Sequence, residues 1–275
     1  MADYKTLHGS NIETVSSDPS NPVAGQVWYN STSQTMKGFT SNPAGSWASS
    51  PATNTATGQL GGNGTSTSAL IYGGNVPVDQ VKTESWNGSS WTEVGDLNTA
   101  RRRLAGAGAD NESALAIGGQ APATVAVVES WDGSSWTEVG DIDAKSNMGA
   151  SGTQTAALSF GGNTGSVVAT NELWNGTSWT EVADLNQASQ YLGGSGTSTS
   201  ALASGGTPPS YDITESWNGT AWTEVADLTT ARGYVATNNG TTSSALCIAG
   251  AVPPYTAATE AFTSPLTATV SFDAS

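Results

Sequence analysis

The sequence predicts an all-β fold made of repeated four-stranded sheets, and two observations lead to this prediction. An eleven-residue motif occurs four times, as ESWNGSSWTEV, ESWDGSSWTEV, ELWNGTSWTEV and ESWNGTAWTEV. A short apolar run closed by glycine keeps the same period, as SALIYGG, SALAIGG, AALSFGG and SALASGG. Self-similarity at a fixed period of about 20–50 residues is typical of repeat architectures, in which each unit packs against its neighbours.

Tryptophans mark each repeat. The first Trp of the motif recurs at spacings of 45, 43 and 43 residues. A degenerate fifth copy, TEAFTSPL, has Phe262 in place of this first Trp, and an upstream Trp lies in register with the second one. The expected structural tryptophans are Trp47, Trp86, Trp91, Trp131, Trp136, Trp174, Trp179, Trp217 and Trp222.

Each unit divides into four expected strands. Strand A is rich in Gly and Ala, strand B is the SALxxGG run, strand C leads into ESW, and strand D is SWTEV. An Asn-Gly or Asp-Gly pair between C and D predicts a two-residue type I′ hairpin. In that register Trp86 faces Ser89 and Glu84 faces Trp91, so both tryptophans lie on one face as diagonal neighbours.

A lone sheet of this kind cannot bury its two tryptophans, whereas stacked copies can. Each Trp hides up to ~200 Å², worth roughly 5 kcal/mol at most. Four strands in 43–45 residues with paired glycines are typical of a β-propeller blade. We expect five blades of four antiparallel strands, closed by the N-terminal strands. Six blades remain the alternative, if QVWYN and QTMKGF form most of an extra one.

The expected organisation has three parts. Residues 1–18 are polar and without periodicity, and they are expected to form an N-terminal arm. Residues 19–47 are expected to form a hairpin and the closing strand of the propeller. Residues 48–275 are expected to form the propeller itself.

The glycine pair that ends strand B, followed by an aromatic residue and a Trp five residues later, resembles the repeat of the kelch family. The resemblance covers Trp47 to about Phe262 and fits a kelch-like subgroup, because the two aromatics lie closer together than is usual in kelch repeats. It implies a β-propeller.

A second resemblance lies in the N-terminal segment Gly25–Lys37, GQVWYNSTSQTMK. It is similar to a short hairpin of bacteriophage tail-fibre and other virion proteins. The resemblance implies a non-enzymatic structural component of a phage particle, on the tail, a fibre or the capsid surface, serving assembly or host attachment. Its expected partners are other virion proteins, in multiple copies, and a host surface glycan or protein. The open alternative is a bacterial extracellular or cell-surface carbohydrate-binding propeller.

Composition excludes several function classes. The formal net charge is −15, so the surface is expected to repel nucleic-acid phosphates. No apolar run approaches the roughly 18 residues of a membrane span. The N-terminal sequence lacks the basic-then-apolar layout of a secretory signal, so we expect synthesis in a host cytoplasm and a final location in the virion.

The sequence also argues against an enzyme. His8 is the only histidine and lies in the N-terminal arm, which excludes Ser-His-Asp and Cys-His sites and a typical zinc site in the propeller. Cys247 is the only cysteine. The most regular acids recur once per repeat, as structural residues do, and are Glu84, Glu129, Glu172, Glu215 and Glu260. We expect no catalytic residue, no metal and no cofactor.

A partner is expected to bind where the repeats vary most. The B–C loops, such as NVPVDQ and TPPSYD, differ from copy to copy and are expected at the same end of the propeller as the D–A connections. Exposed tyrosines at this end would anchor an interface or stack on a sugar. The predicted binding residues are Tyr211, Asp212, Tyr255, Arg101, Arg102 and Arg103.

Overall fold

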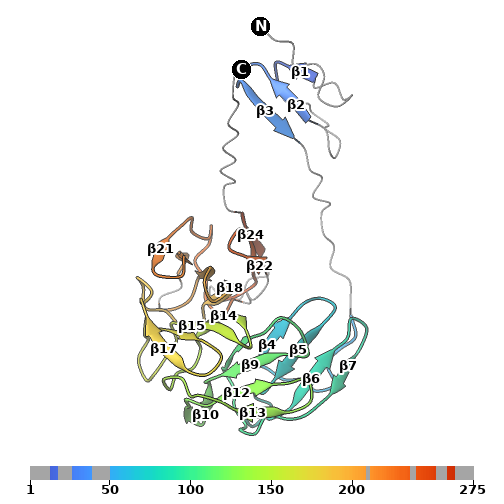
Figure 1. Cartoon of the computed structure of the whole chain (residues 1–275), viewed down its shortest axis with the longest axis vertical. Helices are drawn as coiled ribbons and strands as arrows, with labels where there is room; N and C mark the ends of the chain where they lie inside the picture. Colours follow the sequence, from blue (N-terminus) through green and yellow to red (C-terminus); the bar gives the residue numbers. More distant parts are fainter. Residues whose placement is uncertain are drawn as a thin grey trace. The chain divides into compact units, whose positions relative to one another are not determined.

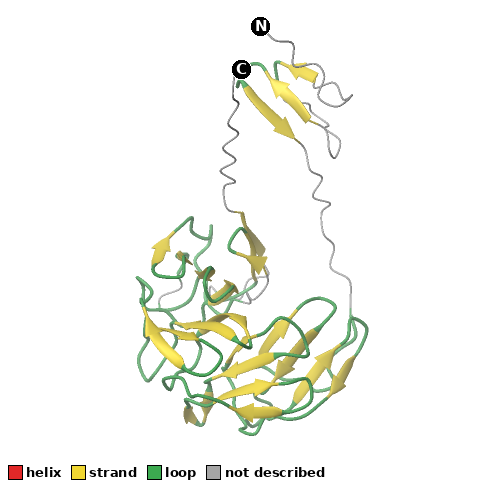
Figure 2. Cartoon of the chain, in the orientation of Figure 1, coloured by secondary structure: helices red, strands yellow, loops and turns green. Residues whose placement is uncertain are grey.

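The computed structural model describes residues 13–17, 27–38, 50–208, 211–235, 240–251 and 259–263. All regular structure in these residues is β (Figures 1 and 2). The chain divides into two compact units, residues 1–50 and 51–275. The larger unit is a five-bladed β-propeller of antiparallel sheets, as the sequence predicts.

The first four blades contain four strands each, hydrogen-bonded in chain order. The first blade consists of β4 (Gly61–Gly64), β5 (Ala69–Tyr72), β6 (Thr83–Trp86) and β7 (Trp91–Glu93). The second consists of β8 (Ala105–Ala107), β9 (Ala114–Ile117), β12 (Val128–Trp131) and β13 (Trp136–Glu138). The third consists of β14 (Gly149–Thr153), β15 (Ala156–Phe160), β16 (Asn171–Trp174) and β17 (Trp179–Val182).

The fourth blade consists of β18 (Gly193–Gly196), β19 (Ala201–Ser204), β20 (Thr214–Trp217) and β21 (Trp222–Glu224). In the fifth blade the structure describes β22 (Gly240–Thr241), β23 (Ser244–Ile248) and β24 (Thr259–Thr263). A two-stranded ribbon, β10 (Gln120–Ala121) with β11 (Ala123–Thr124), decorates the B–C loop of the second blade.

The smaller unit contains a three-stranded sheet of its own. It consists of β1 (Glu13–Val15), β2 (Val27–Asn30) and β3 (Thr35–Gly38), with β1 parallel to β2 and β3 antiparallel to it. The predicted hairpin is therefore confirmed, and the side-chain oxygen of Asn30 stabilises its turn by accepting the N–H groups of Thr32 and Ser33.

In the described residues the strands of this hairpin pair with each other and with β1, and with no strand of a blade, so the expected closing of the propeller by N-terminal strands stays a prediction. The open edge of β2 is taken by β1, and the resulting sheet is separate from the five blades. Trp47, the predicted closing strand, lies outside the described residues, so that part of the assignment stays a prediction.

The loop between strands C and D differs from the predicted two-residue turn. In the first blade Trp86 lies directly opposite Trp91, and the loop holds the four residues between them. Among these four residues the positive φ belongs to Gly88, at 91°. The side-chain oxygen of Asn87 accepts the N–H groups of Ser89 and Ser90, each at 3.0 Å, and this local capping favours the longer loop.

The tryptophans bury themselves between blades, as expected. Trp131 and Trp136 of the second blade lie in one core cluster with Leu70 and Tyr72 of the first. The rings of Tyr72 and Trp136 meet edge-on at a centroid distance of 4.8 Å. The indole N–H of Trp136 donates to the Thr83 hydroxyl at 3.0 Å, which adds a polar contact between the same two sheets. This packing repeats between later blades.

The inner strands are glycine-rich because neighbouring blades approach closely there. Contacts between blades run in order through β4, β8, β14, β18 and β22. A Cβ atom on Gly106 would lie 2.5 Å from the carbonyl oxygen of Gly62 and would also strike the hydroxyl of Tyr72. A Cβ atom on Gly194 would lie 2.8 Å from the ring of Phe160. Side chains at these positions would force the blades apart.

Gly106→Ala is expected to destabilise the propeller by about 1–3 kcal/mol, because the backbone of the first blade must move to admit the methyl group. Gly58→Ala is the matched control, because no atom lies within 4 Å of its Cβ position. Urea unfolding monitored by tryptophan fluorescence measures both. Equal midpoints for the two variants would contradict this account of the inner strands.

Asp132 gives the C–D loop of the second blade an acid dependence. The Ser134 hydroxyl and the N–H groups of Ser135 and Ser134 lower the pKa of Asp132 to about 2. The stabilisation is therefore complete above the ordinary pKa of about 4 and is lost as the pH falls towards 2. Between these pH values the melting temperature of the wild type is expected to fall faster than that of Asp132→Asn. Parallel melting curves across this range would refute the assignment.

Candidate functional site

One end of the propeller brings the D–A connections and the B–C loops together, as the sequence predicts. In every blade a residue of the D–A connection forms an isolated backbone bridge to the start of a B–C loop. The pairs are Gly58 with Asn75, Arg102 with Gln120, Ser146 with Asn163, Gln190 with Thr207, and Gly233 with Ala251.

Next to these bridges, one position of each D–A connection adopts a left-handed backbone conformation. We call these five residues the axial ring. They are Gln59 (φ 58°), Arg103 (57°), Asn147 (58°), Tyr191 (56°) and Tyr234 (57°). Each backbone N–H after the first donates to the carbonyl of the preceding member, at 2.7, 3.0, 2.8 and 2.8 Å in chain order. The ring therefore has a fixed backbone.

The side chains of the axial ring are unexpected for this backbone conformation. A left-handed conformation costs an L-residue roughly 1–2 kcal/mol, whereas glycine adopts it freely. If only the loop geometry mattered, glycine would serve best at all five positions. The chain instead places one Gln, one Arg, one Asn and two Tyr there. Strain kept at equivalent positions with differing polar side chains indicates a functional use of those side chains.

The axial ring borders an open pocket of about 380 Å³. Its polar lining includes Arg103, Gln120, Asn147, Asn163, Gln190 and Tyr191. The guanidinium of Arg103 donates to the side-chain oxygens of Gln120 at 3.1 Å and Gln59 at 3.2 Å, which orients it at the rim. The lining residues, all within the described part of the chain, include no Asp, Glu, His or Cys.

Two tyrosines of the ring form a stacked pair. The rings of Tyr191 and Tyr234 lie 3.9 Å apart with an interplanar angle of 25°. Tyr191 lines the pocket, and Tyr234 is 52% exposed. Amides, a guanidinium and a half-buried and an exposed aromatic ring together can hydrogen-bond and stack on a polar ligand.

The three predicted arginines have three different environments. Arg101 is fully buried, 3.2 Å from Glu129, so the prediction that it contacts a partner is wrong. Burial lowers its pKa, and the attraction of Glu129 opposes this. Arg102 forms a half-buried ion pair with Asp79 at 2.6 Å. Only Arg103 of the three lines the pocket.

The other predicted residues lie away from the pocket lining or outside the described structure. Tyr211 is half-buried rather than exposed, because its hydroxyl donates to the carbonyl of Pro208 and accepts from the side chain of Gln187. Asp212 is exposed but does not line the pocket. Tyr255 lies outside the described residues, so its role stays a prediction.

Comparison with known proteins supports the architecture. The solved structure of YjhT, a propeller protein, superposes with a TM-score of 0.64 at 13% sequence identity, covering 77% of this chain and 82% of that one. At this identity the likeness concerns the fold. No protein-family model matches the chain, and no curated protein matches it.

The chain is a β-propeller.

Its blade-periodic glutamates have structural roles, as expected. The Glu129 carboxylate accepts the backbone N–H of Asn98 at 2.7 Å, its side-chain amide at 2.8 Å and the N–H of Thr99 at 3.3 Å. It thereby fixes the chain segment that enters its own blade and that carries Arg103 towards the pocket.

Within the described ranges, His, Cys, Asp and Glu side chains nowhere gather in threes suited to a metal ion. The same residues contain no helix long and apolar enough to cross a membrane. Cys247 is buried, and this burial raises the pKa of its thiol.

Most residues of the axial ring were missed by the sequence analysis, although a signal was present. The ring positions are separated by 44, 44, 44 and 43 residues. Their identities do not repeat, and a motif search detects only what repeats. Aligning the blades on their glycine pairs and then asking which inner position keeps large polar residues would have found them.

Asn147→Gly is expected to leave the free energy of unfolding unchanged or to raise it by up to about 1 kcal/mol, because glycine relieves the left-handed strain. The melting temperature should therefore stay the same or rise. Asn147→Ala is the matched control and should not stabilise, since it retains the Cβ atom. Calorimetry on the full chain checks both. A lower melting temperature for the glycine variant than for the alanine variant would contradict the strain argument.

Proposed function

We propose that this propeller is a non-enzymatic structural component of a bacteriophage particle, on the tail, a fibre or the capsid surface. In this proposal the axial pocket contacts a polar partner during host attachment or assembly. The observation that carries the binding role is the axial ring, where a fixed and strained backbone presents five polar side chains of four kinds, three of which line the pocket.

The lining of the axial pocket supports a binding role over a catalytic one. General acid–base or nucleophilic catalysis needs a titratable or activated group within hydrogen-bond reach of the substrate. The lining of this pocket offers amides, hydroxyls and one guanidinium, which hold a ligand by hydrogen bonds and stacking.

The phage assignment is supported by the N-terminal segment. The strands β2 and β3 form the hairpin whose sequence resembles a segment of virion proteins. The net charge of −15 disfavours a nucleic-acid partner, which leaves proteins and glycans as the expected ones.

A second candidate is a bacterial extracellular carbohydrate-binding propeller. The stacked pair of Tyr191 and Tyr234 beside an amide-lined pocket favours it, because sugars present apolar ring faces and rows of hydroxyl groups. The two candidates share the ligand chemistry and differ in where the protein resides.

Immunogold electron microscopy of native material that contains this protein separates the two candidates. The proposal expects label on phage particles, and its position there distinguishes tail, fibre and capsid surface. Label on intact cell envelopes, with none on particles, would overturn the phage assignment and support the second candidate.

The role of the pocket is tested with the purified full chain on host cells. Arg103→Gly and Asn147→Gly remove polar groups from the pocket without straining the backbone, and each is expected to weaken binding about tenfold, the equivalent of one good hydrogen bond. Thr92→Ala, on the exposed outer strand β7, is the control. Unchanged binding by both glycine variants would exclude the pocket as the contact surface.

A further inference from the structure

Three of the five blades pair their strand-C glutamate with a cation from the D–A connection. Arg101 lies 3.2 Å from Glu129, Lys145 lies 2.9 Å from Glu172, and Arg232 pairs with Glu260. The three cationic side chains are fully buried. A buried carboxylate is costly unless its charge is compensated, and these blades supply the compensation from their own sequence.

The other two blades lack this cation. Thr57 and Ser189 occupy the equivalent positions, each 44 residues from a cationic one. The corresponding glutamates, Glu84 and Glu215, are nevertheless only 3% exposed. Among the described residues, every hydrogen bond to Glu84 comes from an N–H donor on Asn54 or Thr55, so its carboxylate acts as an acceptor in each.

Both blades contain a small cavity where the cation would otherwise lie. The cavity of the first blade is lined by Thr57 and Glu84, and that of the fourth by Ser189 and Glu215. Each has a volume of about 10 Å³. This is about the space of one water-sized sphere, and potassium and ammonium ions have nearly this size.

The backbone positions whose carbonyls hold the arginine in the second blade have equivalents in the lining of the two cavities. Arg101 donates to the carbonyls of Ala116 at 3.2 Å and Val127 at 2.5 Å, in addition to its ion pair. Ala116 lies opposite Glu129 in the sheet, and Val127 precedes that glutamate by two residues.

The equivalent residues line both cavities. In the first blade they are Ile71, which lies opposite Glu84, and Lys82. In the fourth they are Ala203, which lies opposite Glu215, and Ile213. Each cavity therefore combines one carboxylate with the two backbone positions whose carbonyls bind a cationic side chain elsewhere. Carboxylate and carbonyl oxygens are ligands for hard cations, and carbonyls can replace the hydration shell of potassium.

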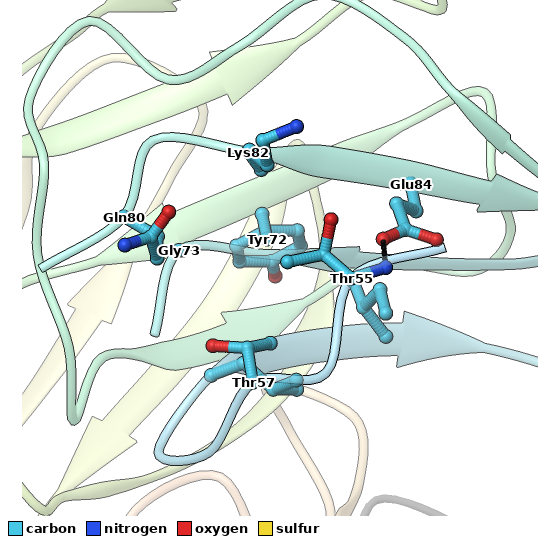
Figure 3. Close-up of a pocket in the computed structure, with 9 residues that line it drawn as sticks. Thr55, Thr57, Tyr72, Gly73, Gln80, Lys82 and Glu84 are labelled. Atoms are coloured by element: carbon cyan, nitrogen blue, oxygen red, sulfur yellow. Dashed lines mark hydrogen bonds between the residues drawn. The ribbon is translucent and has the colours of Figure 1, made fainter. Parts of the chain in front are cut away.

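Lys82 is the cationic residue in the lining of the first cavity, and its charge interacts with that of Glu84, but its ammonium group is not placed in the cavity. The ammonium of Lys82 is directed to Glu93, at 2.7 Å, and points away from the cavity in Figure 3. Figure 3 also shows Glu84 held by the N–H of Thr55 on the other side. The hydroxyl oxygen of Thr57 is buried and makes no hydrogen bond within the described residues. No Lys or Arg lines the cavity of the fourth blade.

We propose that each of these two cavities binds one small monovalent cation, of the size of potassium or ammonium, between the glutamate carboxylate and the two backbone carbonyls. The charge follows from the other blades, where a single guanidinium or ammonium group compensates one carboxylate. At equivalent places, the propeller thus has a cationic side chain in three blades and a bound, dissociable cation in the other two.

Crystals of the full chain soaked in thallium(I), a heavy substitute for potassium, test the sites directly. Anomalous difference maps are expected to show one peak beside Glu84 and one beside Glu215. In solution, replacing choline chloride by potassium chloride at constant ionic strength is expected to raise the melting temperature, by about 3 °C per site at ten times its dissociation constant.

The double variant Thr57→Arg/Ser189→Arg supplies the missing guanidinium groups from the chain itself. It is expected to lose both thallium peaks and the response to potassium. Glu84→Gln/Glu215→Gln keeps the shape of both cavities, removes the charge and should lose the same two signals. Absence of thallium at both sites in the wild type, with superposed melting curves in potassium and choline, would overturn the proposal and leave water as the occupant.

Discussion

The glutamate that recurs once per blade, buried in the first four blades, makes the interactions on which the rest of the propeller depends. It lies on strand C, accepts N–H groups from the segment that enters its blade, and thereby fixes the start of the D–A connection. In the second blade Glu129 holds Asn98 and Thr99, and two residues later Arg101 returns to the same carboxylate. The next residues form the bridge to the B–C loop and then the axial ring. The Glu129 carboxylate thus helps to position the residues of the pocket, although it does not line the pocket itself.

The sequence predicted the architecture well because the forces that build it act identically in every blade. Tryptophans bury themselves against the neighbouring sheet and glycines line the inner strands, so both leave a periodic pattern. The details that failed are those in which a local hydrogen bond decides between alternatives. Asn87 prefers to cap two N–H groups, which lengthens the C–D loop by two residues over the predicted turn. The strand β1 pairs in parallel with the edge of β2. A parallel pairing is not joined by a tight turn, so the sequence contains no turn residues that would predict it.

The candidate site was harder to predict for the opposite reason. The run of three arginines correctly indicated the D–A connection of the second blade, but the three side chains are buried to different extents and have different partners. Arg101 forms an ion pair with Glu129, and Arg102 forms one with Asp79. Arg103 is therefore the one of the three that lines the pocket. Tyr211, which was predicted to bind a partner, donates its hydroxyl hydrogen to the carbonyl of Pro208 in its own loop. The tyrosines that stack, Tyr191 and Tyr234, were overlooked because their positions carry other residue types in other blades. Residues that the fold requires recur in every blade, whereas the residues of the pocket differ between blades and leave no periodic pattern.

The chain of backbone hydrogen bonds through the axial ring has an evolutionary consequence. Each bond joins the backbone N–H of one ring residue to the backbone carbonyl of the ring residue one repeat earlier, whatever their side chains. Duplication or loss of a segment of one repeat length therefore preserves the donor, the acceptor and the blade interface at the new junction. A gene of this kind can exchange whole blades by recombination between its own repeats, and each exchange brings a different side chain to the pocket. The fold is consequently able to change the side chains of this pocket in single genetic steps while its core stays the same.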